Sequence, residues 1–256
     1  MIKKVVILAG GLGTRLSEET KLIPKPMVKI GRMPILLHLI KYYSTYGVQN
    51  FIICLGYKGN VIKKFFLNYE KKNKNFCVHI NKIIQNKLKK DYKSNIILVD
   101  TGIDTQTGGR LQKVKKFIDK NENFYFTYGD GLSNVNLNKL LKFHLKHKKM
   151  CTVTAVQPNN KFGVLNIAKN HYVNFFNEKP KNDWINGGFF VLRDSVIKLI
   201  KNKKTIFERS TLKKITKKKQ LVAFKHKGFW QCMDTLKDKN YLNEIWLKKK
   251  VFWKNW

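Results

Sequence analysis

A glycine-rich loop followed by two cations is the part of the sequence best suited to holding phosphates. Glycine leaves backbone N–H groups open to a phosphate because no side chain intervenes. Arg15 follows the glycines and Lys25 stands between two prolines, so both cations could neutralise a triphosphate. Leu16 takes the place of the third glycine of a dinucleotide fingerprint, and the loop lacks the Gly-Lys-Ser/Thr ending of a P-loop. The phosphate-binding stretch consists of Leu8, Ala9, Gly10, Gly11, Leu12, Gly13 and Thr14.

Two aspartates are candidate ligands for a divalent metal ion. Asp130 lies between Gly129 and Gly131, directly after an apolar run, at the edge where open α/β sheets bind ligands. Asp234 opens the last helical segment. Mg²⁺ in proteins prefers one or two carboxylates together with phosphate oxygens. Each aspartate also has an ordinary alternative, because Asp130 could cap a turn and Asp234 could be the N-cap of the helix.

Two polar, glycine-containing segments could recognise a base and a sugar. Hydroxyls and open backbone between residues 105 and 110 could hydrogen-bond a pyrimidine edge, and Arg110 could reach a base carbonyl or a phosphate. Asn186 and Gly187 offer one amide and bare backbone, which suit sugar hydroxyls. A helix start and a plain β-turn are the alternatives that bind no ligand. The candidate residues of the first segment are Thr105, Thr107, Gly108 and Arg110.

Together these motifs resemble the sugar-1-phosphate nucleotidyltransferases, and the resemblance covers the whole chain. Many members share the opening L-A-G-G-x-G-T-R-L, the following K-P and the Glu-Lys-Pro of residues 178–180. The Thr-Gly-Gly-Arg of residues 107–110 and the Met-Asp-Thr-Leu of residues 233–236 point to members that use CTP. The chain departs from the family where Cys232 replaces a proline and where Ser210-Thr211 replaces Glu-Pro.

The resemblance implies transfer of a cytidylyl group from CTP to α-D-glucose 1-phosphate, giving CDP-glucose and pyrophosphate. It implies Mg²⁺ on Asp130 and Asp234, catalysis by Arg15 and Lys25, and nucleotide binding by the glycine loop, the 105–110 segment and Gly129. The attacking sugar phosphate is already ionised near neutral pH, so the reaction needs no general base. The sugar-phosphate contacts that it implies are Tyr128, Lys179, Asn186 and Gly187.

The surplus of positive charge suggests a second class of function, nucleic-acid binding. Lysine and arginine number 52 against 16 acids, a formal net charge of +36. Only five of these 52 are arginine, the residue whose planar guanidinium reads bases and phosphates. Lysine, asparagine and isoleucine are all plentiful and share A/T-rich codons, so we attribute the charge mainly to composition and expect no specific nucleic acid. The open alternatives are the same chemistry with UTP or dTTP, a basic nucleic-acid-binding protein, and a catalytically silent homologue.

Composition also indicates in which cellular compartment we expect the protein. The apolar runs fall far short of the roughly 20 residues that a membrane helix needs, so we expect no membrane span. The four cysteines are widely spaced and contain no Cys-x-x-Cys pair, which argues against a zinc site or a disulfide scaffold. We therefore expect a reduced, cytoplasmic protein, and the resemblance implies a homo-oligomer.

Strands that alternate with helices must position these residues. Short apolar runs predict buried strands at residues 5–9, 51–55, 96–99 and 124–128. Helical spacing predicts helices at residues 34–47, 61–69, 111–118 and 137–145. This alternation predicts an α/β fold, a doubly wound Rossmann-like mixed sheet flanked by helices.

The second half of the chain predicts a β-rich elaboration that binds the sugar. Its strand-like runs cover residues 151–156, 163–167, 172–176 and 188–192, and helical stretches follow at 195–201, 206–217 and 235–247. No linker or internal repeat divides the chain. We expect one domain over residues 1–256, with a nucleotide-binding core in 1–150 and a sugar-phosphate-binding part in 151–256.

Overall fold

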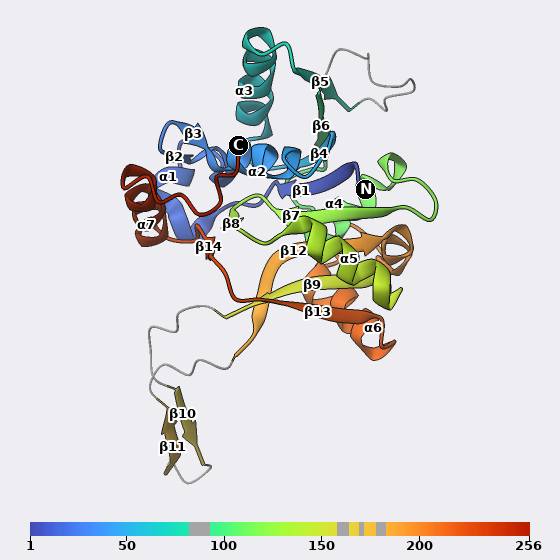
Figure 1. The fold of residues 1–256 in the computed structure, drawn as a ribbon, viewed down its shortest axis with the longest axis vertical. Helices are drawn as coiled ribbons and strands as arrows, with labels where there is room; N and C mark the ends of the chain where they lie inside the picture. Colours follow the sequence, from blue (N-terminus) through green and yellow to red (C-terminus); the bar gives the residue numbers. More distant parts are fainter. Residues whose placement is uncertain (82–92, 158–163, 169–171, 178–182) are drawn as a thin grey trace.

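An eight-stranded sheet forms the centre of the computed structural model (Figure 1). The structure describes all residues except 82–92, 158–163, 169–171 and 178–182. In sheet order the strands are β13 (Leu221–His226), β9 (Cys151–Val156), β12 (Ile185–Arg193), β7 (Asn123–Tyr128), β1 (Lys4–Ala9), β4 (Asn50–Leu55), β6 (Ser94–Asp100) and β5 (Phe76–Ile80). Strands from both halves of the chain therefore share one sheet.

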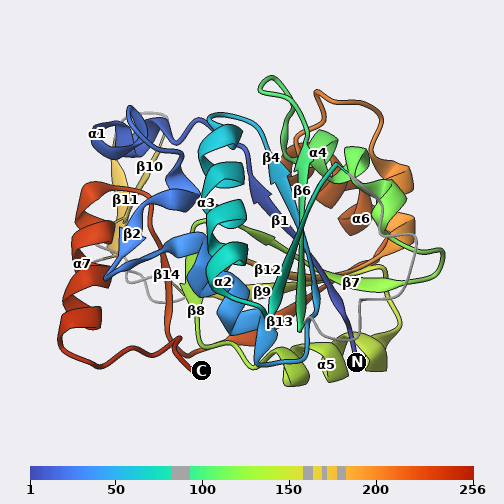
Figure 2. The ribbon, with the colours of Figure 1, turned by 90° about the horizontal axis from the view of Figure 1, so that it is seen from above.

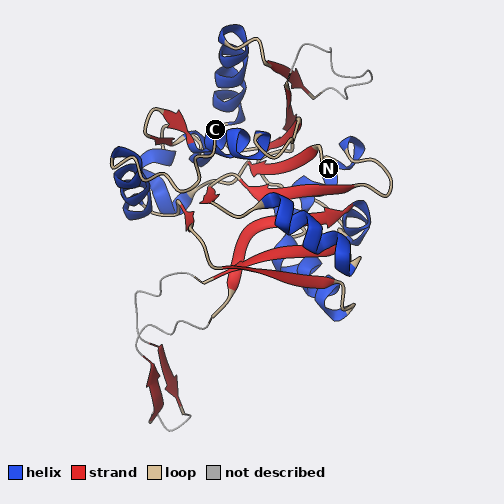
Figure 3. Cartoon of the chain, viewed as in Figure 1, coloured by secondary structure: helices blue, strands red, loops and turns tan. Residues whose placement is uncertain are grey.

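The sheet is mixed, as the sequence predicts. The five strands from β7 to β5 are all parallel, whereas β12 runs antiparallel to both β7 and β9, and β13 runs parallel to β9. Parallel strands need crossover connections. Helices lie in several of these connections, on both sides of the strands (Figure 3). The predicted doubly wound α/β class is confirmed.

Both faces of the sheet are buried, which explains the uninterrupted apolar runs. Along β1, Val5 and Ile7 face one core while Val6 and Leu8 face the other, because successive side chains of a strand point to opposite faces. The first core is covered by α2 (Ile35–Ser44), α3 (Gly59–Lys72), α5 (Leu137–His147) and α7 (Leu236–Leu247). The second is covered by α4 (Thr107–Lys113) and α6 (Leu212–Lys217). Figure 2 shows α2 and α3 lying across the strands.

One helix begins earlier than its local sequence predicts. We predicted a helix at residues 111–118, but α4 starts at Thr107, contains Gly108 and Gly109, and is followed by a 3₁₀ turn, Lys115–Phe117. A Cβ atom at Gly109 would lie 2.3 Å from the carbonyl oxygen of Lys203. The glycines therefore allow residues 203–207 to pack against α4, a contact between distant segments that local helical periodicity does not reveal.

Other local predictions were incomplete. The strands β5 and β13 were not predicted, because their alternating residues are only half buried. The predicted helix at residues 195–201 is a 3₁₀ helix, Asp194–Leu199, and the one at 206–217 is a π-helical turn, Phe207–Thr211, that leads into α6. The predicted strands near 163–167 and 172–176 are β10 (Val164–Ile167) and β11 (Val173–Asn177), which pair with each other in a separate two-stranded sheet.

Two short strands connect the centre of the chain with its C-terminal part. β8 (Gly131–Ser133) pairs antiparallel with β14 (Trp230–Cys232), and Cys232 lies opposite Gly131. A second small hairpin joins β2 (Lys29–Ile30) and β3 (Met33–Pro34) just before α2. Within the described residues, no helix has both the length and the apolar character required to cross a bilayer.

Candidate functional site

A cleft of about 430 Å³ opens where β1 and β7 end. Parallel strands place their carboxyl ends at one edge of a sheet, and ligands of open α/β sheets bind there. The volume lies within the range of small-molecule sites, roughly 300–1,000 Å³. The cleft is lined by Leu8, Ala9, Gly10, Gly11, Gly13, Thr14, Arg15, Lys25, Pro26, Thr105, Gln106, Thr107, Arg110, Tyr128, Gly129, Asp130, Cys232 and Asp234.

Most of the predicted site residues therefore share one cleft, with five exceptions. Leu12 is 53% exposed and lies outside the lining. This agrees with a loop that binds a ligand through its backbone, because the side chain of Leu12 then needs no contact with the ligand. Gly108 faces Thr205 instead of the cleft. Asn186 and Gly187 also lie outside the lining, and Lys179 lies outside the described residues. Pro26, Gln106 and Cys232 line the cleft but were not among the predicted site residues.

The glycine loop turns back toward the cleft at Gly13. Gly13 has a positive φ of 68°, a conformation that favours glycine, and a 3₁₀ turn, Thr14–Leu16, follows it. This turn carries Arg15, whose guanidinium pairs with the carboxylate of Asp234 while its side chain stays 75% exposed. Arg15 therefore has a partner at the site and can still move to meet a ligand.

Lys25 lies between the two aspartates. Its Nζ atom donates to Asp130 Oδ2 at 2.7 Å and to Asp234 Oδ1 at 2.8 Å, and the residue is 8% exposed. Burial by itself lowers the pKa of a lysine, but the carboxylate of Asp130 and the hydrogen bonds to both aspartates outweigh burial and raise the pKa of Lys25 to about 12. Lys25 is therefore a permanent positive charge at the cleft.

The pairing of β8 with β14 brings the two aspartates together. Asp130 lies in the turn between β7 and β8, and its carbonyl oxygen accepts from the backbone N–H of Met233 at 2.8 Å. Asp234 lies two positions after the end of β14. Thr235, not Asp234, is the N-cap of α7, in a capping box with Asp238. The structure thus resolves the alternative for Asp234, whose carboxylate is free of capping and faces the cleft.

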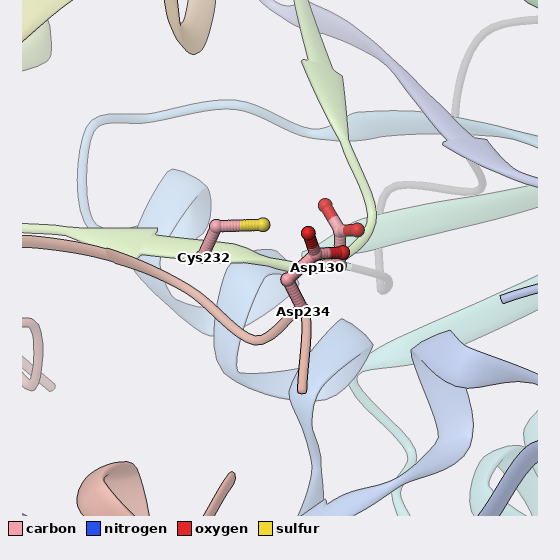
Figure 4. A group of neighbouring side chains, drawn as sticks. All are labelled: Asp130, Cys232 and Asp234. Carbon is pink, nitrogen blue, oxygen red and sulfur yellow. The ribbon is translucent and has the colours of Figure 1, made fainter. Parts of the chain in front are cut away.

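Three side chains at this point could together hold a metal ion. Asp130, Cys232 and Asp234 each offer one ligand atom, and these atoms lie within 4.8 Å of one another (Figure 4). The ammonium of Lys25 already bridges the carboxylates, so the site stabilises positive charge between them. The two oxygen donors fit a hard divalent cation, whereas the sulfur of Cys232 does not. Burial, and then the nearby carboxylate of Asp130, raise the pKa of Cys232, which favours the protonated thiol.

Arg110 lies behind the glycine loop with its guanidinium bonded to protein atoms. The residue is 4% exposed and donates to the hydroxyl of Thr101 at 2.6 Å. It also donates to four carbonyl oxygens, those of Gly10, Leu55, Gly102 and Ile103. These bonds connect the ends of β1, β4 and β6, so Arg110 stabilises the shape of the cleft. Its predicted contact with a base or a phosphate stays a prediction.

Glu208, which the sequence analysis missed, connects two of the predicted residues. Its Oε2 accepts from the hydroxyl of Thr107 at 2.7 Å, and its Oε1 accepts from the hydroxyl of Tyr128. The hydroxyl of Thr107 in turn accepts from the backbone N–H of Phe207 at 2.8 Å. The hydroxyl of Thr107 therefore both donates and accepts a hydrogen bond within the protein. The one available signal was the scarcity of acids, 16 in the whole chain.

Comparison with known proteins agrees with this geometry. Residues 4–244 match the nucleotidyl transferase family. The chain is 49% identical to the glucose-1-phosphate cytidylyltransferase of Salmonella typhimurium, covering 99% of both chains. It is 41% identical to a probable glucose-1-phosphate cytidylyltransferase of Bacillus subtilis, covering 99% of this chain and 100% of the relative. The solved structure of HddC from Yersinia pseudotuberculosis matches with a TM-score of 0.69 and 26% identity, covering 96% of this chain and 100% of that one. On this evidence the chain belongs to the nucleotidyl transferase family.

Proposed function

We propose that this enzyme transfers a cytidylyl group from CTP to α-D-glucose 1-phosphate and releases pyrophosphate. The observation that carries the proposal is the cluster of Lys25, Asp130 and Asp234, with Arg15 beside it, at the mouth of a glycine-lined cleft. Such a cluster is suited to phosphate chemistry, since it combines phosphate-neutralising cations with carboxylates for a metal. The choice of CTP and glucose 1-phosphate rests on the two relatives that carry those substrates in their names.

Asp130 and Asp234 are the residues that would hold Mg²⁺. When bound, Mg²⁺ neutralises phosphate charge and orients the triphosphate toward its attacker. The fit rests on the donor set, because both carboxylates point to one place and a cation already lies between them. Cys232 is not assigned as a ligand, since Mg²⁺ takes oxygen donors.

The remaining residues of the site position the substrates and neutralise their phosphate charge. We infer that backbone N–H groups of the loop from Gly10 to Thr14 bind the triphosphate, since most of this loop lines the cleft. Gly129 supports this, because it lets the chain approach closely at the end of β7. The attacking oxygen is the ionised phosphate of the sugar, which forms a bond to the α-phosphorus as the bond to pyrophosphate breaks. Lys25 and Arg15 stabilise the charge that develops on the phosphate oxygens, and no residue has to remove a proton.

We assign recognition of the base and of the sugar to different residues of the cleft. Thr105 and the backbone near Gln106 are the proposed contacts for cytosine, because the hydroxyl of Thr107 is already bonded to Glu208. Among the lining residues, Tyr128 is the proposed contact for the sugar. Asn186 lies next to it and donates from Nδ2 to Tyr128 Oη at 3.4 Å. We place the enzyme in the cytoplasm, in line with its four cysteines, which form no disulfide bond: Cys54, Cys77, Cys151 and Cys232.

Pyrophosphate release measured with each nucleoside triphosphate and glucose 1-phosphate tests the proposal. We expect turnover that depends on Mg²⁺ and is fastest with CTP. The matched control is the variant Asp130→Asn, which keeps the shape of the side chain and loses its charge. Faster turnover with UTP or dTTP would move the specificity to another pyrimidine nucleotide. Absence of pyrophosphate with every nucleotide would refute the enzymatic assignment in favour of a catalytically silent homologue.

A further inference from the structure

Glu208 lies outside the lining of the cleft and binds two of the residues that form it. It lies in the π-helical turn Phe207–Thr211 and is half buried, and it is not part of the lining. Each of its two carboxylate oxygens accepts one hydroxyl from a residue that does line the cleft, Tyr128 on one side and Thr107 on the other. A carboxylate with both oxygens occupied has little freedom to rotate. Its position therefore fixes the direction of both hydroxyl groups.

The bond to Glu208 determines which hydrogen-bonding partner Tyr128 can accept. A tyrosine hydroxyl has one proton, and an ionised carboxylate can only accept, so that proton points away from the cleft toward Glu208. A phenol keeps its proton near neutral pH. Toward the cleft the oxygen of Tyr128 offers lone pairs alone. A ligand that bonds to it must donate.

Asn186 supports the role of the Tyr128 hydroxyl as a hydrogen-bond acceptor. Its Oδ1 accepts from the backbone N–H of Gly188 at 2.8 Å, which turns its Nδ2 toward Tyr128 Oη at 3.4 Å. The hydroxyl of Tyr128 thus gives its proton to Glu208 and meets the amide of Asn186 with a lone pair. An incoming group with an O–H bond is the one that completes this arrangement.

We propose that Glu208 is a positioning and specificity-determining residue, which fixes the Tyr128 hydroxyl as an acceptor for one hydroxyl of the sugar phosphate. The inference rests on the proposed function, since it takes the sugar phosphate as the ligand next to Tyr128. Glu208 itself touches no substrate and acts through Tyr128. The chemical class of the recognised group is an alcohol that donates a hydrogen bond.

Analogues of glucose 1-phosphate that each carry fluorine in place of one hydroxyl provide the test, because fluorine cannot donate a hydrogen bond. The ratio of kcat/KM for glucose 1-phosphate to that for each analogue is measured in wild-type enzyme, Glu208→Met and Tyr128→Phe. Methionine keeps much of the volume of glutamate and offers no strong acceptor. In wild type we expect one analogue to be disfavoured roughly tenfold, the effect of one lost hydrogen bond to an acceptor of fixed direction.

In Glu208→Met the tyrosine proton is free to turn toward the cleft and meet fluorine. We expect the discrimination against that one analogue to shrink to about twofold in this variant and in Tyr128→Phe, while the ratios for the other analogues stay unchanged. The double variant Glu208→Met/Tyr128→Phe should discriminate against that analogue to the same extent as Tyr128→Phe alone, because both changes remove the same interaction. Glu122→Met is the matched control, since Glu122 is also a half-buried carboxylate with two donors, Lys4 and the backbone of Asp119, away from the cleft.

Two results would overturn the role of Glu208. In the first, Glu208→Met keeps the wild-type ratios and merely lowers kcat/KM for every analogue by the same factor, as a purely structural defect would. In the second, no analogue is disfavoured by wild type. If Glu208→Met loses its cooperative thermal transition, the same ratios are measured in Glu208→Ala, where water can take the place of the carboxylate. Failure of wild type to use glucose 1-phosphate at all would instead refute the proposed function.

Discussion

Replacing Lys25 with methionine removes the one charge that bridges Asp130 and Asp234. The side chain of Lys25 is 10% exposed, and those of the two aspartates are 24% and 21% exposed. Methionine fills a similar volume but leaves two carboxylates facing each other, with Arg15 bound to one of them. The variant should therefore be less stable without metal and should depend on an added cation for its stability.

The size of the effect follows from the exposure of the three groups. Removing one partner of a fully buried ion pair costs about 3–5 kcal/mol. Because the carboxylates keep a fifth to a quarter of their surface in water, we expect a smaller loss of unfolding free energy, about 2–3 kcal/mol. For a domain of this size, such a loss corresponds to a decrease in Tm of roughly 5–10 °C.

Thermal unfolding with and without Mg²⁺ measures this effect. Mg²⁺ should raise the Tm of Lys25→Met more than that of wild type, because no ammonium competes for the carboxylates in the variant. The double variant Lys25→Met/Asp130→Asn should recover part of the lost stability, since one of the opposed charges is gone. In turnover, kcat should fall by about 10²–10³, the cost of losing one preorganised donor to the transition state. Equal Tm values for wild type and Lys25→Met without metal would refute the bridging role of Lys25.

Four further predictions concern the cleft and the buried core. Asp130→Asn and Asp234→Asn should each abolish turnover with the fold intact, checked by pyrophosphate release and circular dichroism; near-normal kcat at saturating Mg²⁺ would remove that residue from the metal site. Cys232→Ser should keep Mg²⁺-dependent kcat within about twofold, because Mg²⁺ takes oxygen donors, and a large loss would assign the sulfur a role. Arg110→Met should lower the free energy of unfolding by about 3 kcal/mol or more, since it removes the five hydrogen bonds that the buried guanidinium donates; urea unfolding that matches wild type would contradict this. His38 is fully buried, and burial lowers its pKa from 6.5 to about 4, so the unfolded chain takes up a proton at this residue that the native one does not. The contribution of His38 to the fall in stability from pH 6.5 to pH 4 should be about 3 kcal/mol, in addition to that of His144, whose pKa burial also lowers to about 4; a flat profile in that range would argue against a neutral buried His38.

Local patterns in the sequence were sufficient for four of the five strands in the parallel part of the sheet. The strands β1, β4, β6 and β7 are buried on both faces, so each appears as a continuous apolar run that ends at a turn. The strands β5 and β13 lie at the two edges of the sheet, where half-exposed residues weaken the apolar signal. The start of α4 was misplaced because its glycines look like a loop until the packed segment 203–207 is known.

The chemistry of the candidate site was also predictable in part. The glycine loop, Arg15, Lys25 and the two aspartates could be selected because few residue types can bind phosphate or metal and because they follow apolar strands. Glu208 could not be selected, since an isolated carboxylate in a lysine-rich stretch resembles an ordinary surface charge. Its role follows from two hydroxyls that lie far from it in the sequence, 101 positions away at Thr107 and 80 at Tyr128.

The sequence by itself determined which groups are present: a loop whose glycines leave the backbone open, cations next to it, and carboxylates in turns. Only the tertiary structure decided that these groups meet. Lys25 is 105 positions from Asp130 and 209 from Asp234, yet a single ammonium reaches both carboxylates. The contact exists because β14 pairs with β8 beside the end of β7, and the pairing of strands so distant along the chain depends on the order of the whole sheet. No short stretch of residues carries that order, since every residue except proline offers the same backbone donor and acceptor to a neighbouring strand.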